Sequence, residues 1–187
     1  MFRQIKIAKE DQVYQKILWR RSVKEPIMEY QLPIETCGMT AALYLALRTI
    51  QELCDEEKLK YPLAAKIVKH NRYVDDVLTG SETLAKAHQA QTELTEIFKK
   101  GSFVLRKWLS NSQDLMETIP EGQKNVGLEA LDKEDTHKTL GIHWSPVEDV
   151  IMFKINITKY NKITKRLALS KIAKIYDQLG WIVPVIM

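Results

Sequence analysis

Two adjacent aspartates, Asp75 and Asp76, constrain the fold more than any other feature of this sequence. They lie between Tyr73-Val74 and Val77-Leu78, pairs of residues that favour strands. Aspartate itself is a common residue of tight turns. The sequence therefore predicts a β-hairpin with buried arms and with both carboxylates at its tip.

The two carboxylates are also candidate ligands of a metal ion. Most Asp-Asp pairs at turns only face water. Here, however, like charges repel one another beside apolar residues, which is unfavourable unless a cation compensates. Magnesium prefers carboxylate oxygens and shares its coordination shell with substrate phosphates. We therefore expect Asp75 and Asp76 to bind magnesium.

Around the hairpin, the apolar pattern predicts the helices and short strands of an α+β fold. In the clearest helix, Gly101 follows the apolar stripe and is placed for a left-handed C-terminal cap. That stripe consists of Leu84, Ala87, Gln91, Leu94, Ile97 and Phe98, and an earlier helix has its stripe at Leu43, Ala46, Leu47, Ile50 and Leu53. Strands are predicted at 27–32 and 103–108, a hairpin at 139–144 and 150–155, a surface loop at 121–138 and a last helix at 170–176. Near the N-terminus, the predicted buried side chains are Ile5, Ile7, Val13, Ile17 and Leu18.

The composition is that of a globular domain, with 45% apolar and 28% charged residues. No segment is apolar enough to span a bilayer or to act as a signal peptide. Cys37 and Cys54 lack the spacing of metal ligands and are too few for a disulfide framework. This favours two buried thiols in an intracellular compartment, cytoplasmic or nuclear.

Positive charge is concentrated in the last third of the chain. Residues 150–176 include seven basic residues and no acidic one, although the net charge of the whole chain is only +4. Two interpretations fit this pattern, a solvated lysine-rich face and a surface that binds a nucleic-acid backbone. The basic residues are Lys154, Lys159, Lys162, Lys165, Arg166, Lys171 and Lys174.

The Tyr73-Val74-Asp75-Asp76 tetrapeptide resembles the central motif of reverse transcriptases. The neighbouring Pro62-Leu63-Ala64-Ala65-Lys66 and Asp76-Val77-Leu78-Thr79-Gly80 are similar to the Bel/Pao-type LTR retrotransposons in particular. Other segments match this family in order and spacing, so that the resemblance runs nearly end to end. These segments are Met1-Phe2-Arg3-Gln4-Ile5, Thr36-Cys37-Gly38, Phe103 to Trp108, Leu140 to Trp144 and Asp177 to Trp181.

The resemblance implies an RNA-directed DNA polymerase that transfers nucleotides to a primer 3′-hydroxyl with two magnesium ions. Residues 1–138 would form a partial palm, an antiparallel sheet with helices on one face, and residues 139–187 a primer-grip hairpin with the start of a basic helical thumb. Partners would be an RNA template, a DNA primer, deoxynucleoside triphosphates and the rest of a polyprotein, with no membrane. Asp75 and Asp76 would be catalytic, Phe2, Gly38 and Tyr73 would contact the nucleotide, and Leu140, Gly141, Ile142, His143 and Trp144 would hold the primer.

The sequence departs from the family pattern at its first motif. The family has an aspartate five residues before the aromatic residue that corresponds to Phe2, and that position falls before Met1. We therefore expect a fragment, truncated at its N-terminus, that is inactive alone. The alternative is a catalytically dead retrotransposon remnant that at most binds nucleic acid through its basic stretch.

Overall fold

The computed structural model describes residues 1–125, 137–139, 142–152 and 164–173, together with positions 177, 180, 181 and 184. The chain divides into two compact units, Met1–Leu105 and Arg106–Met187. The functional boundary that the resemblance implies, between residues 138 and 139, is a different kind of division and stays a prediction.

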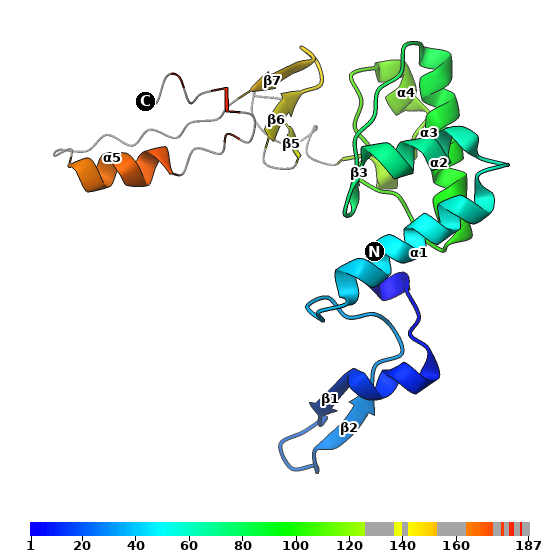
Figure 1. The fold of residues 1–187 in the computed structure, drawn as a ribbon, viewed down its shortest axis with the longest axis vertical. Helices are drawn as coiled ribbons and strands as arrows, with labels where there is room; N and C mark the ends of the chain where they lie inside the picture. The colour runs from blue at the N-terminus through cyan, green and yellow to red at the C-terminus, as the bar shows by residue number, and fades with distance from the viewer. Residues whose placement is uncertain are drawn as a thin grey trace. The chain divides into compact units, whose positions relative to one another are not determined.

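The first unit is built on three α-helices that pack on one another (Figure 1). They are α1 (Ala42–Glu57), α2 (Pro62–Asn71) and α3 (Leu84–Lys100). Each helix contributes one buried stripe at three- and four-residue spacing. The stripes are Ala42, Ala46, Ile50 and Cys54 in α1, Ala64, Ile67 and Val68 in α2, and Ala90, Leu94, Ile97 and Phe98 in α3.

Small side chains occupy the most buried positions of these stripes. Ala46 and Ala64 are fully buried and Ala90 is nearly so. Alanine lets helix backbones approach closely, because little volume separates them. One residue differs from the predicted stripe of α1: Leu43 is 45% exposed, and Ala42 is buried in its place, whereas Ala46 is buried as predicted.

The helix predicted to run up to a cap at Gly101 is confirmed as α3, but the geometry of its C-terminal cap differs from the prediction. Gly101 has φ −83°, whereas Ser102 has the left-handed φ of 61°. Ser102 N–H donates to the Lys99 carbonyl (3.0 Å) and Phe103 N–H to the Phe98 carbonyl (2.9 Å), the two bonds of a Schellman motif. The Phe98 and Phe103 rings meet edge to face, with centroids 6.2 Å apart.

Helix α2 is capped by a side chain from α3. Glu93 Oε2 accepts hydrogen bonds from the backbone N–H groups of Leu63 (2.9 Å) and Ala64 (3.1 Å). These N–H groups belong to the first turn of α2, which has no intrahelical acceptor for them. A carboxylate at this end also interacts favourably with the helix dipole. Glu93 therefore ties the start of α2 to the middle of α3.

Two short strands precede the helices, β1 (Lys16–Trp19) and β2 (Met28–Gln31), which pair antiparallel. The strand predicted at 27–32 is thus confirmed. The predicted burial of Val13, Ile17 and Leu18 is wrong, because these side chains are 44%, 42% and 71% exposed. A two-stranded hairpin has too few neighbours to cover either face. Only Ile5 of that predicted set is buried.

The second unit contains a three-stranded antiparallel sheet in the order β5-β6-β7. Its strands are β5 (His137–Thr139), β6 (Ile142–Ser145) and β7 (Val150–Met152). The hairpin predicted around residues 145–149 is confirmed, but its first arm begins at Ile142 and not at Thr139, and β5 begins inside the stretch predicted as a surface loop. The α-helices that the structure describes in this unit are α4 (Gln113–Glu117) and α5 (Lys165–Ile172). The last helix therefore begins five residues earlier than predicted, after Thr164, whose hydroxyl accepts from Leu167 N–H.

Residues 103–108 do not form the predicted strand. Only Trp108 makes a bridge, with Lys124, and Lys107 has a left-handed φ of 59°. The apolar residue at the start of this segment has a different role: Phe103 is buried against the end of α3 as part of its cap.

The mixture of helices with small antiparallel sheets confirms the α+β class. The structure also contains three short 3-10 helices, η1 (Phe2–Gln4), η2 (Lys9–Tyr14) and η3 (Glu121–Gln123). Across the described ranges, no helix is both long and apolar enough to cross a membrane.

Candidate active site

The acidic pair lies on a hairpin that continues directly from α2. Strand β3 (Arg72–Tyr73) follows Asn71 without a linker and pairs with β4 (Asp76–Val77). Tyr73 is opposite Asp76, so Val74 and Asp75 form a two-residue turn. Leu78 N–H closes the base of the hairpin by donating to the Asn71 carbonyl at 3.0 Å. The predicted hairpin is confirmed, with Asp75 in its turn and Asp76 beside it.

The arms of this hairpin are not buried, contrary to the prediction. Tyr73 is 64% exposed and Leu78 is 48% exposed. Among the residues that the structure describes, β3 and β4 form a two-stranded sheet of their own, so no further strand covers these side chains. Tyr73 and Leu78 are therefore accessible at the surface, whereas Val74 and Val77 are half-buried.

Both aspartate side chains are exposed. Within the described part of the chain, no cluster of three or more His, Cys, Asp or Glu side chains could hold a metal ion. Two consecutive carboxylates are nevertheless a donor set that suits magnesium, which often binds proteins through one or two carboxylates and completes its shell with water and substrate phosphates. The residues present therefore fit a magnesium ion shared with a phosphate-bearing substrate.

The turn has an unusual backbone and a polar support. Val74 has φ 53°, a left-handed value that β-branched residues rarely adopt. The Arg72 guanidinium Nη1 donates to the Val74 carbonyl at 3.2 Å. The Arg72 Nε atom is buried, and none of the residues that the structure describes offers it a hydrogen-bond acceptor. Sequence reasoning missed Arg72, because no spacing pattern distinguishes it from the basic residues at the end of α2.

The charges of Arg72 and Cys54 each affect the pKa of the other residue. Burial lowers the pKa of the Arg72 guanidinium, and the nearby Cys54 thiol opposes that effect. Burial raises the pKa of Cys54, and the Arg72 charge opposes the rise. The prediction of two buried thiols is half right, since Cys54 is buried and Cys37 is exposed.

The three predicted nucleotide contacts lie in different elements of the first unit. Phe2 is half-buried in η1, and Tyr73 is on the hairpin itself. Gly38 has φ 101°, and a Cβ built there would meet no atom within 4 Å. Its backbone conformation, and not crowding, is what requires glycine. Whether these residues act together on a nucleotide stays a prediction.

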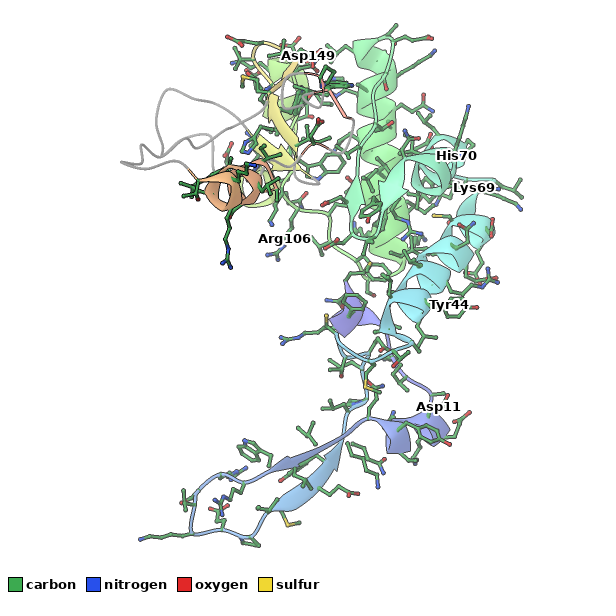
Figure 2. The ribbon with its side chains drawn as sticks, turned by 60° about the vertical axis from the view of Figure 1, so that its left-hand side comes forward. Asp11, Tyr44, Lys69, His70, Arg106 and Asp149 are labelled. Atoms are coloured by element: carbon green, nitrogen blue, oxygen red, sulfur yellow. The ribbon has the colours of Figure 1, made fainter. Side chains whose placement is uncertain are left out.

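Of the predicted primer grip, Ile142, His143 and Trp144 are half-buried in β6, whereas Leu140 and Gly141 lie outside the described residues. Asp149, which turns the chain between β6 and β7 with φ 53°, orders this hairpin. Its carboxylate accepts from Trp144 Nε1 and from Asn111 Nδ2, each at 3.1 Å. Figure 2 labels Asp149 at this turn. The turn between β6 and β7 is thus fixed by a side-chain network around Asp149.

Three of the predicted nucleic-acid-binding residues belong to α5. Lys165 and Arg166 are exposed in its first turn, and Lys171 is half-exposed in its last. Lys154, Lys159, Lys162 and Lys174 lie outside the described residues. In the first unit, Lys69 and His70 add exposed basic side chains at the end of α2, where Figure 2 shows them pointing outward.

Comparison with known proteins adds no relative to this description. No protein-family model, curated protein or solved structure matches the chain. The functional assignment therefore depends on the motif, the hairpin and the residues around them.

Proposed function

We propose that this chain is part of an RNA-directed DNA polymerase of the Bel/Pao retrotransposon type. One observation carries the proposal: the Tyr73-Val74-Asp75-Asp76 motif forms a tight hairpin, with both carboxylates exposed and Tyr73 beside them. Exposed adjacent carboxylates can bind the divalent cations that stabilise the attacking and leaving oxygens in nucleotidyl transfer.

In this proposal, Asp75 and Asp76 hold magnesium, which when bound lowers the pKa of the primer 3′-hydroxyl and neutralises charge that develops on the α-phosphate. The residues of the chain position the reactants. Tyr73, Phe2 and Gly38 contact the incoming nucleotide, and the β6 strand holds the primer end. In the family that the motif resembles, a third carboxylate, five residues before the counterpart of Phe2, completes the metal site. The palm arrangement of sheet and helices is part of the same proposal.

Primer extension tests the proposal. The chain, and a version extended upstream to include that third carboxylate, are incubated with oligo(dT) on poly(rA), deoxythymidine triphosphate and magnesium. We expect extension by the longer version only, and its loss on Asp75→Asn. Asp11→Asn is the matched control, because Asp11 is also an exposed aspartate but belongs to η2 (Figure 2). Activity that survives Asp75→Asn contradicts the proposal.

A binding experiment separates the polymerase from the inactive remnant. If the basic residues of α5 contact a nucleic-acid backbone, the affinity for single-stranded RNA falls steeply as salt is added. Salt-sensitive binding without extension by the longer version supports the remnant. Salt-sensitive binding together with extension supports the polymerase.

A further inference from the structure

The two-residue turn between β3 and β4, formed by Val74 and Asp75, is strained at Val74. Its φ of 53° places a β-branched side chain in the left-handed region, where Cβ crowds the neighbouring carbonyl group. Such a conformation is destabilising and persists only where the surroundings enforce it. A relaxed Val74 would return to negative φ, and the peptide group between residues 74 and 75 would rotate. That rotation would redirect the Asp75 side chain.

Arg72 is the polar group that opposes this relaxation. Its Nη1 atom donates to the Val74 carbonyl at 3.2 Å, which fixes the orientation of the peptide group that would rotate. Arg72 can act as a rigid support for two reasons. Its Nε atom is buried, and its backbone lies at the junction where α2 ends and β3 begins. The planar guanidinium is also better suited than an ammonium group to a directed hydrogen bond.

We propose that Arg72 is a positioning residue: its hydrogen bond to the Val74 carbonyl holds the left-handed turn that orients Asp75 and Asp76 toward a shared divalent cation. The consequence for metal binding rests on the proposed function. The effect of the hydrogen bond from Arg72 on the conformation of Val74, called the link below, is independent of it.

The link is tested by a double-mutant cycle with Arg72→Met and Val74→Gly. Glycine adopts positive φ without strain, so a turn that carries Val74→Gly does not need the Arg72 contact. Arg72→Met should therefore lower the folding equilibrium constant by about tenfold in the parent chain, and by clearly less in the Val74→Gly background. Equal effects in both backgrounds, measured by urea unfolding, would overturn the proposal.

The consequence for the site is measured as Mn²⁺ affinity, through the relaxation of water protons. Arg72→Met should weaken binding by about tenfold, and Val74→Gly in the same chain should restore it. A residue that only contributes to stability would not be rescued in this way. Arg106→Met is the charge-matched control, because Arg106 is exposed and belongs to the second unit.

The remaining outcomes are also decisive. If Arg72→Met does not fold but the double variant does, the link is supported. If neither folds, Arg72 is a general structural residue and the proposal is wrong. If the cycle shows coupling while Asp75→Asn leaves Mn²⁺ binding unchanged, the link stands and the proposed magnesium function fails.

Discussion

Two neighbouring residues, Gly101 and Ser102, have different roles in the C-terminal cap of α3. Ser102 has the left-handed backbone that glycine usually supplies, whereas Gly101 has an ordinary φ. Gly101 is needed for space: a Cβ there would lie 2.7 Å from Leu53 Cδ2 and 2.8 Å from the Phe103 ring. The sequence places a glycine near the end of the helix, but the pattern cannot show which cap position it occupies, because that depends on the contact with α1.

Substitutions at these two residues should have opposite effects. Ser102→Gly removes the steric penalty of a left-handed side chain and should raise the free energy of unfolding by about 0.5–1 kcal/mol. Gly101→Ala should lower it, since Leu53 and the buried Phe103 ring would have to shift to admit the methyl group. Urea unfolding followed by circular dichroism measures both. A loss of stability in Ser102→Gly would contradict the cap geometry.

The buried thiol of Cys54 predicts a pH dependence of stability. Its pKa is raised by burial from the ordinary value of 9.0, so the folded state holds the proton more tightly than the unfolded state. This contribution is complete below pH 9.0 and is lost as the pH rises through the folded pKa. The fall in unfolding free energy above pH 9.0 should therefore be smaller in Cys54→Ala than in the parent chain. If the unfolding free energy depended on pH identically in the two proteins, Cys54 would not contribute to it.

At the scale of elements, the sequence predicts what local periodicity determines. The helix α3 and the acidic hairpin need only their own residues, and both are present. Leu94, Ile97 and Phe98 of the predicted stripe are buried, whereas Leu84 at its start is 40% exposed. A strand at 103–108 needs a neighbouring strand to pair with, but Phe103 instead packs on Phe98 in the C-terminal cap of α3. The exposure of Tyr73 also depends on partners, because burial of a hairpin is decided by what packs on it. The capping of α2 from α3 is a contact across 30 residues that no local pattern reveals.

Glu93→Ala should destabilise the helical part of the first unit. The substitution leaves the Leu63 and Ala64 N–H groups without their acceptor and removes a charge from the start of α2. The expected loss is about 1–2 kcal/mol of unfolding free energy. Glu96→Ala, which removes an exposed ion pair with Lys99 on the same helix, should lose less than about 1 kcal/mol. Equal losses would show that Glu93 does not act as a cap.

At the scale of the whole molecule, the buried apolar residues are unevenly divided. Nearly all the described core belongs to Met1–Leu105, including the fully buried Ile50 and Ile97, whereas Ile119 is the buried aliphatic side chain described in the second unit. Since burial of apolar surface is the main source of stability, the first unit has the means to fold by itself.

A fragment of residues 1–105 should therefore retain the helical signal of α1, α2 and α3 and unfold cooperatively. Circular dichroism in the far ultraviolet during a thermal scan checks this, with Ile97→Ala in the same fragment as a core control. That substitution should lower stability by about 2–5 kcal/mol. A fragment that shows no cooperative transition would mean that the second unit is required for the first to fold.

The alanine-lined crossings of the three helices have a consequence for the acidic turn. Because Ala46 and Ala64 are fully enclosed, a larger residue at either position must be accommodated by sliding or tilting a helix axis. Helix α2 continues into β3 without a linker, so a displacement of α2 would also move the hairpin that carries Asp75 and Asp76. Variation that is remote from the carboxylates and purely steric can therefore tune where they point.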